Sequence, residues 1–342
     1  LEAVATSGSL ADQPQAVINQ LWQALTDDRL ERVIDHGYGG VTSVALSADG
    51  SRLAVVSENG AWVGMYGAPD GGLLWEYTED TADSFRGVYF DPAGARVAVA
   101  VHDSESILGN RLTEPDDLPN RFFVLDATDG SMVTTIDYPA CVTAIALGWS
   151  PDGSRFVVSN GFSGCEREGA TNGTWAEILD GETFSPIALV DSPARWVGPT
   201  PSFDRANNLY LLGFDDNAVV HAAPDYELAR EIPDSVGLGA VAPDGSLLTT
   251  FSSARPALQS IYAVDSGERV DIVTQVAEFP AEPFGTAFSP DGSLLAIQTK
   301  GSRTLVWGVA TGELLFDLPS GAPGVNPVVS RDAKWLYTSH DD

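Results

Sequence analysis

Thr-Ala-Phe-Ser-Pro-Asp-Gly at residues 286–292 is the clearest copy of a phrase that recurs along the whole chain. In each copy an apolar stretch leads into an Asp-Gly turn, and a second apolar stretch follows. Close copies read Val-Ala-Leu-Ser-Ala-Asp-Gly at 44–50, Leu-Gly-Trp-Ser-Pro-Asp-Gly at 147–153 and Ala-Val-Ala-Pro-Asp-Gly at 240–245. Looser copies lie at 90–94, 203–206 and 330–333. One such unit cannot bury its apolar face alone, so the repeat predicts units that stack on one another.

The spacing of the seven turns indicates the kind of unit. The turns follow one another at intervals of 39 to 59 residues, with a mean of about 47, which is typical of the four-stranded blade of a β-propeller. In the sixth unit we expect strands at 284–289, 293–298, 303–309 and 313–318, separated by Gly, Asp and Ser turns. Asp-Gly suits a tight hairpin because glycine adopts a positive φ and the aspartate bonds its own backbone.

The predicted fold is therefore all-β: a seven-bladed propeller of four-stranded antiparallel blades over residues 30–342. The blades are expected near 41–85, 86–142, 143–197, 198–237, 238–283, 284–324 and 325–342. The last of these is too short for four strands, so we expect strand 30–34 to close it. We also expect the native chain to continue beyond Asp342.

Residues 1–29 are predicted to form an extension that contains one short amphipathic helix. Asp12 can cap this helix and Pro14 suits its first turn. An apolar helical stripe then follows, with the spacing i, i+3, i+4 and i+7, at Ile18, Leu21, Trp22 and Leu25.

The repeat resembles that of the WD-repeat propellers. The structural dipeptide of that family has counterparts at Leu125-Asp126, Leu179-Asp180, Val264-Asp265 and Trp307-Gly308, and Asp35-His36-Gly37 is similar to its Gly-His signature. Units one and four depart from the pattern. Residues 15–33 resemble the helical segment that precedes the propellers of bacterial STAND-type signalling ATPases. This resemblance implies a sensor or scaffold portion of a larger signalling protein.

The charge is strongly acidic. Asp and Glu number 48 against 18 Lys and Arg, for a net charge of −30. Such a chain repels phosphate backbones and anionic lipids, so we expect no nucleic acid and no membrane as partner. No apolar run approaches the roughly 20 residues that span a bilayer. We favour solubility as the role of the charge, with a basic partner as the alternative.

Cys141 and Cys165 are the only two cysteines. Both are expected in loops on one face, where they could form a disulfide. A disulfide would indicate an oxidising, extracytoplasmic compartment. We favour two free thiols and a cytoplasmic location, with the disulfide as the alternative.

The sequence offers no convincing catalytic centre. The four histidines, His36, His102, His221 and His340, fall in different units, and no paired metal-ligand motif, nucleophile elbow or phosphate-binding loop is present. We expect no catalytic residue, no metal and no cofactor.

Two insertions are the best functional signal. They cover residues 102–121 and 161–174, both between the second and third strands of neighbouring blades, and long loops on a rigid scaffold often carry binding. The connection at 195–196 is expected on the same rim. The candidate binding residues are His102, Asp103, Glu105, Arg111, Glu114, Asp116, Asp117, Arg121, Glu166, Arg167, Arg195 and Trp196.

The function that the sequence favours is a non-catalytic scaffold or sensor propeller in bacterial signalling. It would bind a protein partner or a small ligand through the face that carries the two insertions. Two alternatives stay open at this point. One is a propeller hydrolase or lactonase with a divalent ion at the channel mouth, and the other is a secreted or surface scaffold.

Overall fold

The chain divides into two compact units, Leu1–His36 and Gly37–Asp342. The computed structural model describes Ile34, Gly37, Tyr38 and residues 40–57, 61–68, 70–79, 84–102, 121–138, 145–160, 175–191, 201–212, 217–235, 238–251, 259–270, 283–299, 303–319, 327–330 and 336–338. The helix expected within residues 1–29 lies outside them, as does the strand expected at 30–34 apart from Ile34, which is not in a strand. No helix occurs among the described residues, so none there could cross a membrane.

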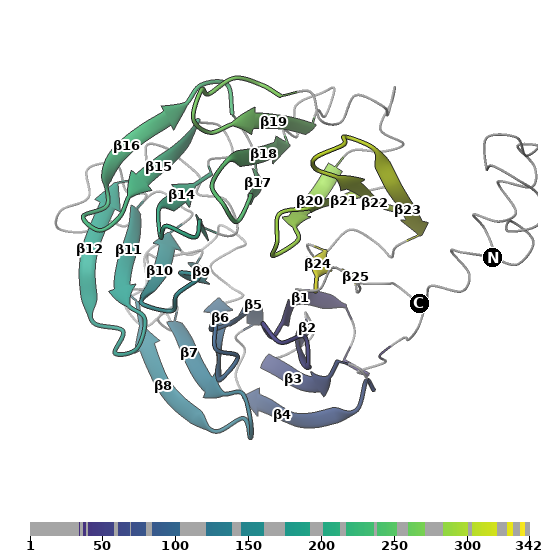
Figure 1. Ribbon diagram of the computed structural model, residues 1–342. Coiled ribbons are helices and arrows are strands. Elements are labelled where there is room, and N and C mark those ends of the chain that lie inside the picture. The colour runs from purple at the N-terminus through teal and green to yellow at the C-terminus, as the bar shows by residue number, and fades with distance from the viewer. Residues whose placement is uncertain are drawn as a thin grey trace, which may run out of the picture. The chain divides into compact units, whose positions relative to one another are not determined.

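The second unit is a ring of small antiparallel sheets, each made of strands consecutive in the sequence (Figure 1). Blade one contains β1 (Val41–Leu46), β2 (Arg52–Ser57), β3 (Ala61–Gly67) and β4 (Leu73–Glu79). Blade two contains β5 (Ser84–Phe90), β6 (Arg96–His102), β7 (Arg121–Asp126) and β8 (Met132–Asp137). Blade three contains β9 (Ile145–Trp149), β10 (Arg155–Asn160), β11 (Trp175–Asp180) and β12 (Pro186–Asp191).

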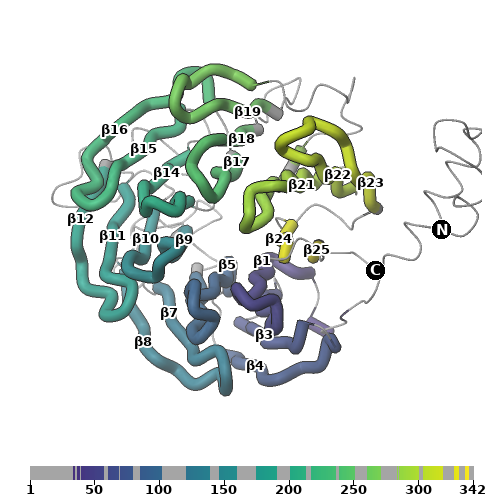
Figure 2. Tube along the Cα trace, in the orientation of Figure 1, coloured from purple at the N-terminus to yellow at the C-terminus, as the bar shows by residue number. Residues whose placement is uncertain are grey.

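The next three blades continue the ring, as the Cα trace shows (Figure 2). Blade four contains β13 (Ser202–Phe203), β14 (Leu209–Leu211), β15 (Ala218–Ala222) and β16 (Glu227–Ile232). Blade five contains three strands, β17 (Leu238–Val241), β18 (Leu247–Phe251) and β19 (Gln259–Ala263). Blade six contains β20 (Pro283–Phe288), β21 (Leu294–Thr299), β22 (Arg303–Gly308) and β23 (Leu314–Pro319).

The number of blades corrects the sequence prediction. The described residues form six blades and not seven, and the last sheet consists only of β24 (Val328–Val329) and β25 (Leu336–Tyr337). Its strand β24 lies against the innermost strands β20 and β1. Strands β24 and β25 pair as an antiparallel hairpin at the seventh turn, but among the described residues no further strand joins their sheet, whereas strand 30–34 was expected to close it.

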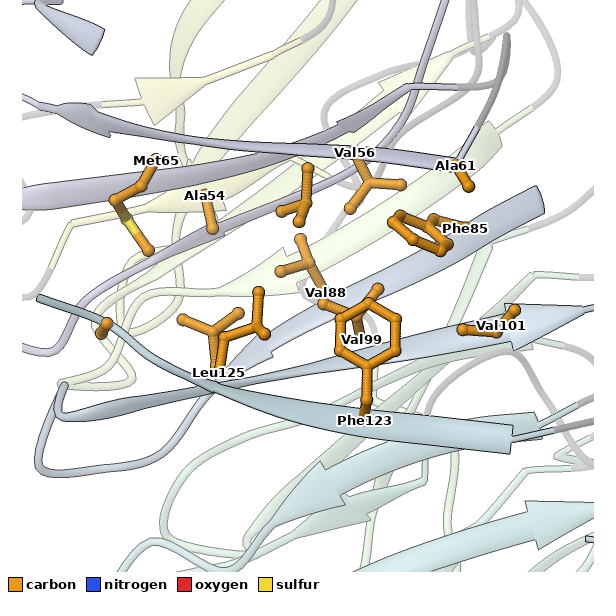
Figure 3. Packing of buried hydrophobic residues seen from close by; sticks show 13 residues of the cluster. Ala54, Val56, Ala61, Met65, Phe85, Val88, Val99, Val101, Phe123 and Leu125 are labelled. Carbon is orange, nitrogen blue, oxygen red and sulfur yellow. The ribbon is translucent and has the colours of Figure 1, made fainter. Parts of the chain in front are cut away.

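The apolar cores lie between the blades and not within them. The inner strands β2 and β6 are buried along almost their whole length, because a neighbouring blade covers each face. Between blades one and two, Ala54, Val56 and Met65 face Val99 and Phe123 (Figure 3). A similar cluster joins blades two and three. Each blade therefore depends on its neighbours for burial, as the repeat predicts.

Candidate functional site: the insertion face

The strand order gives the ring two distinct faces. Hairpins between first and second strands, and turns between third and fourth strands, lie on one face, which we call the turn face. The opposite face, where second strands end and third strands begin, we call the insertion face. There β6 ends at His102 and β7 begins at Arg121, while β10 ends at Asn160 and β11 begins at Trp175. Both expected insertions therefore leave and re-enter on the insertion face of adjacent blades.

Two of the expected binding residues fall on the described part of the chain. His102 is the last residue of β6, where its backbone pairs with Ser84, and Arg121 is the first residue of β7. The others lie outside the described residues and stay predictions: Asp103, Glu105, Arg111, Glu114, Asp116, Asp117, Glu166, Arg167, Arg195 and Trp196. Cys141 and Cys165 lie outside them as well, so their pairing also stays a prediction.

Arg121 ties blade two to blade one at the base of the first insertion. Its Nη2 donates to Oε2 of Glu79, at the end of the outermost strand of blade one, and the two side chains are 22% and 14% exposed. Tyr77 donates to the other oxygen of Glu79 at 2.8 Å. Burial and this hydrogen bond raise the pKa of Tyr77 to about 12, so the phenol stays a donor at neutral pH. Arg121 therefore has an anchoring role, which the sequence did not reveal.

A second tie joins blades two and three near the base of the second insertion. The Tyr138 hydroxyl donates to Oε2 of Glu177 at 2.9 Å, and both residues are buried. The Tyr138 ring also packs against Trp175, the first residue of β11, with centroids 6.0 Å apart. A buried carboxylate is costly unless it accepts hydrogen bonds, so this contact fixes how the two blades meet where the insertion begins.

The sequence pattern predicted none of these four partners: Glu79, Tyr77, Tyr138 and Glu177. A signal for one of them was present, because Glu177 interrupts the otherwise apolar stretch Trp-Ala-Glu-Ile-Leu at 175–179. An acid among buried strand residues predicts a polar partner on the facing blade. The other three lie at strand ends, where polar residues are ordinary.

On the turn face, the aspartates of the repeated turns accept hydrogen bonds from residues of the same turn. Asp49 accepts hydrogen bonds from Ser47 Oγ at 2.7 Å, Ser51 Oγ at 2.8 Å and the Ser51 amide at 3.0 Å. These bonds lower the pKa of Asp49 to about 2. Asp291 repeats the arrangement with Ser289 and Ser293, which likewise lower its pKa. The repeated aspartate is therefore explained by turn geometry.

Asp152 extends the same turn to the next blade. Burial opposes its ionisation, but hydrogen bonds from Ser154, Asn207 and Ser150 outweigh this effect and hold its pKa well below the usual range. The Asn207 amide lies in blade four and donates to Asp152 at 2.7 Å. This contact joins blades three and four on the turn face.

The described residues bring together no group of three or more His, Cys, Asp or Glu side chains that could hold a metal ion. His221, in β15, is buried, and its Nδ1 lies 3.0 Å from the Tyr226 carbonyl oxygen. Burial lowers the pKa of His221, so the ring is neutral and Nδ1–H is the donor in this contact. His221 thus stabilises the third-to-fourth turn of blade four.

A search of solved structures found a chain from the hydrazine synthase of Kuenenia stuttgartiensis, with a TM-score of 0.65 and 16% sequence identity. The match covers 91% of this chain and 95% of that one. No protein-family model and no curated protein matched. Similarity at this identity shows the fold alone, and by its fold this chain is a β-propeller of four-stranded antiparallel blades.

Proposed function

We propose that the ring is a non-catalytic binding platform that takes a protein partner or a small ligand on its insertion face. The observation that carries the proposal is the placement of the two insertion bases. The ends of β6 and β7 and the ends of β10 and β11 lie on one face of adjacent blades. Loops that rise side by side from rigid sheets commonly form binding surfaces.

The side-chain contacts between neighbouring blades support a binding platform of fixed shape. Glu79 and Arg121 join blades one and two, and Tyr138 and Glu177 join blades two and three. Each contact lies next to an insertion base, so these bases keep a constant separation. A preorganised surface loses less conformational entropy when a partner binds.

We further propose that the platform belongs to a larger bacterial signalling protein and works in the cytoplasm, with Cys141 and Cys165 as free thiols. The support is the sequence resemblance of residues 15–33 and of the repeat itself. The similarity to a hydrazine synthase chain adds no activity, since it rests on fold. Thiol titration of the unfolded, unreduced chain tests the location: two thiols agree with it, and none contradicts it.

The main experiment removes the first insertion without disturbing its anchor. Residues 102–120 are replaced by Asn-Gly, which closes a two-residue hairpin on the paired residues Val101 and Arg121 and keeps the Arg121–Glu79 contact. Proteins captured from extract of the source organism are compared for the intact and shortened chains. The matched control shortens 252–258, between β18 and β19 on the same face of blade five.

We expect the shortened chain to melt within a few degrees of the intact chain and to lose the captured partner, while the control keeps it. Equal capture by all three chains would show that the first insertion is not part of the binding site.

A further inference from the structure

Gln298 and Thr304 form a buried polar pair in blade six. They lie opposite each other on β21 and β22, and both residues are 0% exposed. Within the described part of the chain, no group hydrogen-bonds to Nε2 or Oε1 of Gln298 or to Oγ1 of Thr304. A buried polar group without a partner loses the hydrogen bonds that water would give it. The pair therefore makes the closed arrangement of its surroundings less stable.

The pair faces the two-stranded sheet of β24 and β25. Residues two apart on a strand share one face of a sheet, so the pair lies on the same face as Ala296 and Val306. Ala296 and Val306 pack against Val329 of β24, and β24 lies beside β20 of blade six (Figure 1). The polar pair therefore belongs to the junction between blade six and this short sheet.

Blades one and two have apolar pairs at the same position of the repeat. The residue six positions after the turn glycine is Gln298 in blade six, Val56 in blade one and Ala100 in blade two. Val56 pairs with Val63, and Ala100 pairs with Phe122. Both pairs belong to the apolar clusters that join neighbouring blades. The junction beside blade six thus holds hydrogen-bonding groups where these two junctions hold apolar side chains.

The two kinds of junction differ in what opening exposes. Separation of blades one and two would bring Val56 and Val63 into water, which is unfavourable. Separation of blade six from the short sheet would let water pair with the polar atoms of Gln298 and Thr304, which removes the cost of burying them unpaired. Opening at this junction therefore costs less free energy than it would with an apolar pair at the same position.

We propose that the junction between blade six and the β24–β25 sheet is a built-in opening point of the ring, and that Gln298 and Thr304 set how often it opens. Local opening occurs where burial is least favourable, and it leaves the rest of a fold intact. The insertions belong to blades two and three, so this motion leaves the insertion bases in place. The proposal is independent of the binding function proposed above.

Thr299 provides a matched control on the same strand. It is also 0% exposed, but it lies on the opposite face, and its Oγ1 donates to the Arg303 carbonyl oxygen at 3.2 Å. A change from threonine to valine replaces a hydroxyl by a methyl group of similar size. T304V and T299V therefore make the same chemical change at a hydroxyl without a partner and at a hydroxyl with one.

The test follows the exchange of the Gln298 side-chain amide hydrogens with solvent in ¹H–¹⁵N spectra of the full chain. Because this amide is buried, its hydrogens exchange only when the junction opens. The Asn208 side-chain amide, which donates to Asp204 at 2.9 Å in blade four, is the internal reference. The unfolding midpoint in urea is measured for the same chains.

We expect T304V to slow the exchange of Gln298 about threefold or more. Asn208 should be unaffected, and the urea midpoint of T304V should be no lower than that of the unmodified chain. T299V should lower the midpoint, because it removes a hydrogen bond of the folded chain, and it should not slow Gln298. Unchanged exchange of Gln298 in T304V would overturn the proposal. An equal loss of stability in T304V and T299V would overturn it as well, because Thr304 would then have a hydrogen-bond partner in the closed ring.

Discussion

At the residue scale, the repeated aspartate is the most informative position in the chain, and its role is structural. Asp49, Asp244 and Asp291 each bond a serine two residues later, and these bonds lower their pKa values. The glycine that follows each of them has a positive φ, for example +72° at Gly50. Short-range turn chemistry of this kind is readable from sequence because both partners lie within a few residues.

These turns predict a loss of stability in acid. A carboxyl whose pKa is lower in the folded than in the unfolded chain stabilises the fold above the unfolded value of about 3.9. That stabilisation disappears as the pH falls through the folded value, which is about 2 for Asp49. We expect the free energy of unfolding, measured by urea titration, to drop between about pH 4 and about pH 2.

The variant D49N isolates one turn in that measurement. Asparagine can still accept from Ser47 and Ser51, but it does not titrate in this range. Its free energy of unfolding should fall less steeply with acid than that of the unmodified chain. Identical slopes would show that Asp49 contributes nothing to the acid response.

Gly64 gives a second prediction at this scale. In G64A the new Cβ meets the Trp62 ring at 2.4 Å, and overpacking of this kind costs about 1–3 kcal/mol. G50A serves as the control, because nothing lies within 4 Å of its Cβ and its cost comes from the positive φ alone. Both variants should melt earlier, but only G64A should move the Trp62 indole resonance. A resonance unmoved in G64A would contradict the packing described here.

At the element scale, the observed strands and hairpins agree closely with those expected from the sequence. The contacts between blades were not predicted from it. The four strands expected in unit six agree with β20 to β23 to within about one residue at each end. Alternation and turn signals are local, so they mark strands well. The pairing of Arg121 with Glu79 joins residues 42 positions apart, and no local pattern encodes such a partner.

The Arg121–Glu79 pair predicts a measurable coupling between blades. In a double-mutant cycle with R121Q and E79Q, we expect an interaction energy of about 1 kcal/mol, since partly exposed ion pairs contribute little more. Urea unfolding of the four chains provides the measurement. A coupling of zero would mean that Arg121 does not fix the base of the first insertion.

The buried hydrogen bond from Tyr138 to Glu177, between blades two and three, should contribute more to the free energy of unfolding than the Arg121–Glu79 pair does. Tyr138→Phe removes a donor from the buried Glu177 carboxylate, and leaving a buried acceptor short of a partner costs about 1–3 kcal/mol. We expect a lower unfolding midpoint in urea than that of the unmodified chain. An unchanged midpoint in Y138F would show that this hydroxyl does not hold the two blades together.

At the scale of the whole molecule, the repeat predicted a propeller and overcounted its blades. The seventh turn, at 330–333, lies between β24 and β25, so the motif correctly marks a hairpin. Each turn motif predicts only the two strands of its own hairpin, however, and does not predict the third and fourth strands of a blade. Counting turns therefore gave seven blades, whereas the described residues form six and a two-stranded sheet.

The places where the two insertions leave their sheets were predictable from sequence, and their role in binding stays a prediction. Sequence spacing located the two insertions, and the ends of β6, β7, β10 and β11 lie on one face as expected. The hydrogen bond from Trp62 Nε1 to Glu76 was not predictable in this way, because it depends on the register of β3 against β4. Such contacts exist only once the sheet has formed.

The most direct test of the central claim is hydrogen–deuterium exchange of the full chain with and without its captured partner. We expect slower exchange on binding in peptides that cover 102–121 and 161–174, with the Asp-Gly turns of the opposite face unchanged. Protection confined to those turns, or no protection at either insertion, would contradict the claim that the insertion face is where this propeller binds.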